Sequence, residues 1–150
     1  MQLKTLLFMM IVLAAGTILP IQAGINGKLG RAVNSPIAAA FISFATGFIL
    51  LGLYLIAMRQ NPFDFAGTSG APWWIWTGGL LGAFFVSIAT ALVPRLGATL
   101  SFSLIIAGRL LISIIIDKYG LFGIAASDIS IKKIAGISLV IAGVLLIKNS

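Results

Sequence analysis

Long apolar stretches without a charged residue are the feature that most restricts the fold of this chain. Three of them, residues 5–27, 32–58 and 73–93, are each long enough to cross the ~30 Å hydrocarbon layer of a membrane as a helix. Hydrophobic residues make up 60% of the chain and charged residues only 9%, so a soluble globule would lack a polar surface. These stretches predict an integral membrane protein of the all-α class.

The rest of the chain holds two further stretches that are less uniformly apolar. Residues 96–116 contain Arg109, and residues 129–147 contain a pair of lysines near their beginning. The uncharged part of the last stretch would reach only about 21 Å, so its lysine side chains must extend toward the lipid headgroups. We therefore expect a single transmembrane domain over residues 1–150, with five membrane-spanning helices.

The composition excludes several classes of function. The chain has no cysteine and no histidine, which removes disulfides, thiol nucleophiles and nearly all transition-metal sites. The Ser and Thr residues lack a histidine partner, no carboxylate pair has suitable spacing, and the sequence has no phosphate-binding loop. We therefore expect neither an enzyme nor a bound cofactor. The net charge of +7 comes from basic residues dispersed among helix ends, which favours the lipid bilayer over nucleic acid as a partner.

Lys and Arg are divided almost evenly between the two sides of the predicted membrane. An excess of these residues on the cytoplasmic side sets the orientation of a membrane protein, and here the count is five against four. A chain without a clear excess can insert in either orientation and pair with an inverted copy of itself. The side on which the chain begins carries Lys4, Arg59, Lys118, Lys132 and Lys133, and the other side carries Lys28, Arg31, Arg95 and Lys148.

Aromatic and small residues indicate how the helices are placed and packed. Three tryptophans follow the longest hydrophilic loop, and because indole rings prefer the headgroup layer we expect them to anchor the third span rather than bind substrate. Small residues recur at every fourth position in two spans, which lets helix backbones approach closely. The tryptophans are Trp73, Trp74 and Trp76, and the small residues are Ala39, Ser43, Gly47, Gly79, Ala83, Ser87 and Ala91.

A proline and two amide side chains form a candidate ligand site in the first span. We expect Pro20 to interrupt this span, because proline removes a backbone donor and frees a carbonyl. Gln22 and Asn26 lie on one helical face just beyond it, and polar groups beside such a break suit the lining of a solute path. An equally weighted alternative is that both amides only hydrogen-bond to neighbouring helices.

Arg109 is the strongest single candidate for a functional group inside the membrane. An arginine near a helix centre opposes insertion by about 2.5–3.5 kcal/mol, so its guanidinium needs a carboxylate, carbonyls, water or an anion. Asp117 lies about 12 Å further along the same helix, so a pair between the two must form across helices or subunits. A structural ion pair and a site for an anionic group are both open. The chain has no glutamate, which disfavours exchange of a cationic drug for protons through a buried glutamate.

The first span contains the motif Pro20-Ile21-Gln22-Ala23-Gly24-Ile25-Asn26, followed by Leu29 and Arg31. This motif resembles the YdcZ-like family of small membrane proteins, which belongs to the drug/metabolite transporter superfamily. Further matches over essentially the whole chain are Ser43-Phe44 with Gly47, Leu96-Gly97-Ala98, Asp117-Lys118-Tyr119-Gly120, and Gly136 with Gly143. Arg109 departs from the family pattern, which usually has glutamine there, so it either changes the charge of the substrate or replaces a polar packing contact.

The resemblance implies a five-span half of a ten-helix drug/metabolite transporter fold. Chains of this family occur as dual-topology homodimers, as paired subunits of opposite orientation or as fused tandem copies. We therefore expect a multi-pass protein of the bacterial inner membrane that moves a small organic solute by alternating access as an antiparallel homodimer. Gln22 and Asn26 would line the path, Arg109 would meet an anionic or polar group, and Asp117 would be its counter-ion or a gate residue.

Two other interpretations are left open by the sequence. The chain could be a non-transporting membrane protein, an assembly or regulatory partner that uses its small residues only to bind other helices. It could also be one subunit of a heterodimeric transporter, because the division of Lys and Arg, five on one side and four on the other, still favours one orientation slightly.

Overall fold

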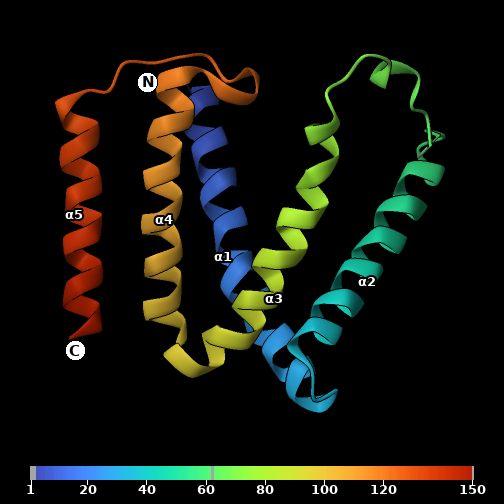
Figure 1. The fold of residues 1–150 in the computed structure, drawn as a ribbon, viewed down its shortest axis with the longest axis horizontal. Helices are drawn as coiled ribbons and strands as arrows, with labels where there is room; N and C mark the ends of the chain where they lie inside the picture. The colour runs from blue at the N-terminus through green and yellow to red at the C-terminus, as the bar shows by residue number, and fades with distance from the viewer. Residues whose placement is uncertain (1–2, 62, 150) are drawn as a thin grey trace. The chain divides into compact units, whose positions relative to one another are not determined.

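The computed structural model describes residues 3–61 and 63–149, and within these ranges every regular element is a helix. The all-α class is therefore confirmed. The chain divides into two compact units, Met1–Arg95 and Leu96–Ser150. The first unit contains α1 (Leu3–Ala32), α2 (Pro36–Ala57) and nearly all of α3 (Gly78–Leu96), and the second contains α4 (Ala98–Tyr119) and α5 (Ile131–Lys148) (Figure 1).

The turn between α1 and α2 is determined by a short capping sequence. Asn34 has a left-handed backbone with φ of 53°, and the Ser35 hydroxyl accepts a hydrogen bond of 3.1 Å from the backbone N–H of Ala38. Pro36 follows at the first helical position, where its missing N–H would have no partner in any case. The predicted limits 27 and 32 are corrected to Ala32 and Pro36, because this cap sets the boundary.

The helix α1 continues through Pro20 without a break. The prediction that Pro20 interrupts the helix of the first span is therefore wrong. Proline still lacks the N–H that would bond to the carbonyl of Gly16, but the turns on both sides remain helical. With 30 residues, α1 is about 45 Å long, which exceeds the ~30 Å hydrocarbon layer.

One narrow face of α1 is buried, and it consists of small residues and one amide. These residues recur at helical spacing and are Ala23, Asn26, Gly27 and Gly30. A β-carbon at Gly30 would lie 3.7 Å from the β-carbon of Ala39 in α2, and Ala39 itself is completely buried. The backbones of α1 and α2 therefore approach through small side chains, as the small-residue pattern of the second span indicates.

The connection from α2 to α3 contains two short 3-10 helices, η1 (Ala66–Thr68) and η2 (Trp73–Thr77). All three tryptophans lie in η2 and are exposed, and the ring of Trp76 packs edge to face against Phe65 with 5.7 Å between ring centroids. Interfacial anchoring by these rings stays a prediction. The regular helix α3 then continues through Pro94 to Leu96, so the predicted end at 93 is corrected.

The second unit consists of α4 and α5, which pack side by side (Figure 1). Gly120 ends α4 in a left-handed conformation with φ of 62°, and its N–H bonds to the carbonyl of Ile116. Ser130 begins α5 by accepting a hydrogen bond of 3.2 Å from the N–H of Lys133. These caps correct the predicted limits 96–116 and 129–147 to Ala98–Tyr119 and Ile131–Lys148.

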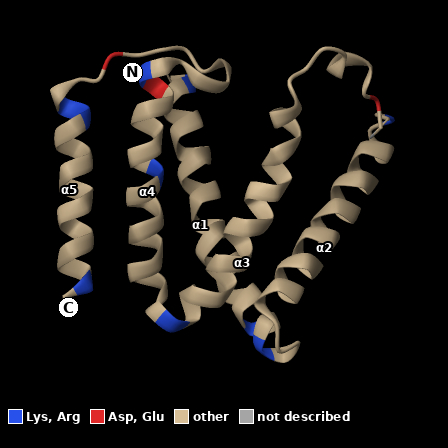
Figure 2. Cartoon of the chain, viewed as in Figure 1, with Lys and Arg blue, Asp and Glu red and all other residues tan. Residues whose placement is uncertain are grey.

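Four helices of the described chain are long and apolar enough to cross a membrane. They are Leu3–Ala32, Pro36–Ala57, Trp73–Leu96 and Ala98–Tyr119. The remaining helix, α5, has 18 residues and carries lysines at both ends. Figure 2 shows that Lys and Arg lie mainly at helix ends, with one basic position near the middle of α4.

Candidate solute site

The two predicted amide ligands occupy different environments on α1. Asn26 is buried at 4% exposure, whereas Gln22, one turn earlier, is exposed in a single copy of the chain. The Nδ2 atom of Asn26 has no hydrogen-bond partner among the described residues. A buried amide donor without a partner is unfavourable by about 1–3 kcal/mol, so Asn26 is a group with an unused donor.

A second unused polar group lies on α3. Thr90 is buried at 3% exposure, and its Oγ1 also lacks a hydrogen-bond partner within the described chain. Other helical hydroxyls here bond to their own backbone, as Thr17 does to the carbonyl of Ala14 at 2.7 Å and Thr46 to that of Ile42 at 2.9 Å. In addition, Pro94 lies four residues after Thr90 and cannot donate to the Thr90 carbonyl. Both polar groups of Thr90 are therefore left without the usual helical partners.

Close backbone approach brings these parts of α1 and α3 together. A β-carbon at Gly27 would lie 2.9 Å from Cγ of Pro94, and one at Gly30 would lie 3.3 Å from Cγ2 of Thr90. Real β-carbons essentially never approach another heavy atom as closely as 2.9 Å, so Gly27 is required by this contact. The two glycines therefore position Thr90 and Pro94 against α1.

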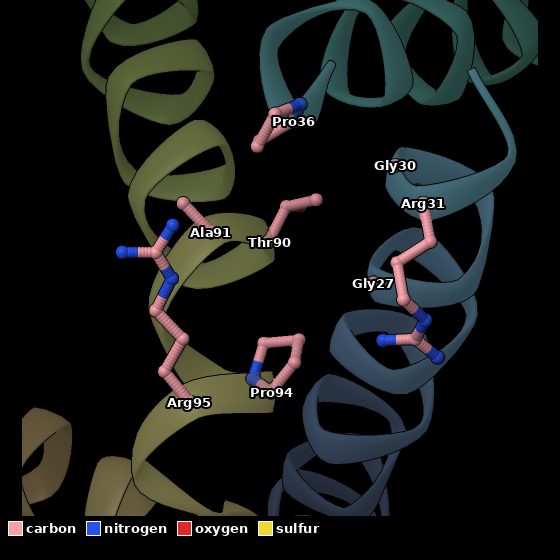
Figure 3. Close-up of a pocket in the computed structure, with 8 residues that line it drawn as sticks. All are labelled: Gly27, Gly30, Arg31, Pro36, Thr90, Ala91, Pro94 and Arg95. Atoms are coloured by element: carbon pink, nitrogen blue, oxygen red, sulfur yellow. The ribbon is translucent and has the colours of Figure 1, made fainter. Parts of the chain in front are cut away.

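A cavity of about 230 Å³ lies beside this contact in the first unit. Figure 3 shows Arg31 of α1 and Arg95 of α3 on opposite sides of it, with Thr90, Pro36 and Pro94 between them. The cavity lies near the end of α1 and the end of α3. Two cations and the start of α2 at Pro36 line the cavity, and this arrangement suits a negatively charged group.

The second unit contains a separate polar cluster between α4 and α5. The Lys133 ammonium lies 3.1 Å from a carboxylate oxygen of Asp117 and donates a hydrogen bond of 2.7 Å to Oγ of Ser127. The backbone N–H of Ser127 also donates to the Asp117 carbonyl at 2.8 Å. A cavity of about 370 Å³ adjoins the cluster and is lined mainly by apolar residues of α4 and α5. Asp117 therefore has a cationic partner within its own unit.

The predicted site residues are divided between the two units. Pro20, Gln22 and Asn26 share α1, whereas Arg109 and Asp117 share α4. The Arg109 side chain is exposed in a single copy and lies about 12 Å along the helix axis from Asp117. The roles of these five residues in binding or gating stay predictions. Within residues 3–61 and 63–149, no group of three His, Cys, Asp or Glu side chains could hold a metal ion.

Sequence reasoning missed Thr90 and Pro94 of α3, and it treated Ala91 only as a packing residue and the two arginines of the cavity only as orientation charges. One signal for Thr90 was present, because it follows Ser87 by three residues and so extends the small-residue face of the third span. The spacing of Gly27 and Gly30 likewise continues the face that begins at Ala23. No pattern in the sequence, however, pairs Gly27 with Pro94.

The long apolar helices and the scarcity of charge define a multi-pass membrane protein. The chain also matches, over residues 7–146, the family described as "Putative inner membrane exporter, YdcZ". It belongs to this family, which is part of the drug/metabolite transporter superfamily, and is a multi-pass protein of the inner membrane. The resemblance seen in the first-span motif is thereby confirmed. No curated protein and no solved structure matches the chain.

Proposed function

We propose that this protein exports a small organic solute by alternating access and that it works as an antiparallel homodimer. The observation that carries the transport role is membership of an inner membrane exporter family over nearly the whole chain. The antiparallel arrangement is supported by the near-even division of Lys and Arg, because the excess that would fix one orientation is missing. Two inverted five-helix copies would provide the ten helices of an internally symmetric transporter.

The Asp117–Lys133 ion pair supports α5 as the fifth span. A lysine near the start of a membrane helix opposes insertion, and pairing its charge with a carboxylate of the preceding helix reduces that penalty. Lys132 and Lys148 lie at the two ends of α5, where their stems can reach the headgroups. An odd number of spans would place the two termini on opposite sides of the membrane.

The polar groups of α1 and α4 would form the solute path of the dimer. Gln22 is exposed in a single copy and would contact solute or the second copy, while Asn26 offers an unused donor on the buried face. Arg109 would meet an anionic or polar group of the solute, and Asp117 would act as a gate residue whose partner at rest is Lys133.

Reporter fusions at the carboxyl terminus test the orientation. Alkaline phosphatase is active only outside the cytoplasm and green fluorescent protein only inside, so we expect both fusions to be active. Activity of one fusion alone would contradict dual insertion and indicate a partner subunit of opposite orientation. Because the chain has no cysteine, single introduced cysteines can then be cross-linked, and a parallel dimer or a stable monomer would favour a non-transporting assembly partner.

The transport role is tested with purified protein in liposomes. A thermal-shift screen with anions, cations and neutral metabolites selects ligands, and uptake of each selected ligand is compared with that of empty liposomes. We expect at least one stabilising ligand to be transported. Stabilising ligands that never cross the membrane would contradict the transport role.

A further inference from the structure

The cavity between α1 and α3 lies in a part of the first unit that has positive charge without matching negative charge. Lys28 and Arg31 lie in the last turns of α1, and Arg95 lies in the last turn of α3. The first unit has a single carboxylate, Asp64, which lies in the loop beyond the far end of α2. The 22 residues of α2 separate that loop from Pro36 by about 33 Å, several Debye lengths at physiological salt.

The two arginines flank the cavity without an ion pair among the described residues of the first unit. The guanidinium of Arg31 folds back along α1, since its Nη1 would lie 3.9 Å from a β-carbon at Gly27. Arg95 approaches from α3 on the other side (Figure 3). Guanidinium groups match phosphate and carboxylate oxygens through paired hydrogen bonds, and here two of them remain available.

The start of α2 adds to the positive charge at the cavity. Pro36, the first residue of α2, lines the cavity, and the N-terminal end of a helix carries partial positive charge. The ends of α1 and α3 carry partial negative charge, which the formal charges of Arg31 and Arg95 exceed. Thr90 also lines the cavity, but its Oγ1 has almost no accessible surface and does not contact a group inside it.

We infer that this cavity binds an oxyanion, a phosphate or carboxylate group, through the guanidinium groups of Arg31 and Arg95. Its volume of about 230 Å³ is below the ~300–1,000 Å³ of pockets for drug-sized ligands, so it accommodates an anionic group rather than a bulky drug. Such a group can belong to a solute or to the headgroup of an anionic lipid. If the bound group belongs to the exported solute, the inference rests on the proposed export function. Binding of the anion itself can be measured without any transport.

The test uses the full-length protein in a neutral detergent, with the midpoint of thermal unfolding as the readout. Sodium phosphate is compared with sodium chloride at equal ionic strength and pH. In a parallel arm, phosphatidylglycerol is compared with phosphatidylcholine in mixed micelles. We expect phosphate, phosphatidylglycerol or both to raise the midpoint. Stabilisation by phosphate identifies a free-anion site, and stabilisation by phosphatidylglycerol alone identifies a lipid headgroup site. No stabilisation by either probe would overturn the inference.

Substitutions then locate the anion. Arg95→Gln should weaken the stabilising effect about tenfold in probe concentration, consistent with loss of one charged contact. Arg59→Gln is the matched control, because it removes a cation of the same unit outside the cavity and should leave the effect unchanged. Arg95→Lys retains the charge but lacks the paired N–H donors of the guanidinium group, so it should lose an intermediate part of the stabilising effect. This variant keeps the test valid if Arg95→Gln does not fold.

Two outcomes separate this inference from the export proposal. Equal stabilisation of wild type and of the Arg31→Gln/Arg95→Gln double variant would show that the anion binds elsewhere and would overturn the inference. Anion binding that depends on Arg95, combined with liposomes that move no solute, would support the oxyanion site while contradicting export.

Discussion

Pro94 of α3 lies so close to Gly27 of α1 that a β-carbon at position 27 would come within 2.9 Å of the proline ring. The neighbouring contact of Gly30 with Thr90 at 3.3 Å extends the same approach by one turn. Because the ring of proline is rigid, it cannot move aside as a long flexible side chain could. The position of α1 against α3, and with it one wall of the oxyanion cavity, therefore depends on a single missing methyl group.

Replacing Gly27 by alanine should destabilise the protein by about 1–3 kcal/mol, the usual effect of overpacking a rigid contact. Thermal unfolding in detergent measures the loss. The matched control is Gly24→Ala in the same helix, where an added β-carbon would meet nothing within 4 Å. This control should be neutral or slightly stabilising, because alanine favours the helix. Equal midpoints for the two variants would show that the close contact is absent in the membrane protein.

Arg109→Gln should leave membrane insertion and dimerisation intact and weaken ligand protection by about 10–100-fold, the effect of losing a hydrogen bond to a charged group. Lys118→Gln, which removes an exposed cation from the same helix, should have no effect. The measurement is the ligand concentration needed for half-maximal thermal protection, together with uptake into liposomes. If every ligand protects the Arg109 variant and the wild type equally, Arg109 has no part in the site.

Asp117→Asn should lower the stability of the second unit, because Lys133 then loses its 3.1 Å partner. Side-chain exposures of 41% for Lys133 and 37% for Asp117 limit the expected loss to about 0.2–1 kcal/mol. Asp128→Asn, at an exposed carboxylate without an ion pair among the described residues, is the control. A double-mutant cycle with Lys133→Met isolates the pair, and a coupling energy of zero would contradict its contribution.

Gly97→Ala should be destabilising by about 1–3 kcal/mol, since residue 97 has φ of 84° and ψ of 151°, at the edge of a region that only glycine adopts readily. This residue is the single non-helical position between α3 and α4. Gly143→Ala, within α5 and with nothing within 4 Å of an added β-carbon, provides the comparison and should be neutral or stabilising. A Gly97 variant as stable as the Gly143 variant would contradict this backbone conformation.

The helices could be predicted from sequence because twenty consecutive apolar residues have few alternatives to a membrane helix. Their ends could not be placed as well, because local caps decide them. Ser35 and Pro36 begin α2 four residues after the predicted start, and Gly120 ends α4 three residues after the predicted end. Pro20 was expected to break α1, but a helix can lose one hydrogen bond and retain its path.

The candidate site could be predicted only in part. Asn26 stands out in an apolar span, and the structure buries it with an unused donor. Thr90 does not stand out, because threonine in a membrane helix ordinarily bonds to its own backbone, as Thr46 does here. Only the three-dimensional structure distinguishes the two cases. The roles of Arg31 and Arg95 around one cavity depend on the contact of α1 with α3, which no local sequence pattern encodes.

The cavity lies near the ends of α1 and α3, far from the middle of the helices. In a pair of inverted copies, two identical pockets would then face different compartments, one toward the cell interior and one toward the outside. Each pocket would fill according to the anion concentration on its own side. Such a dimer would have two sites of equal affinity, and the occupancy of each site would report the anion concentration in a different compartment.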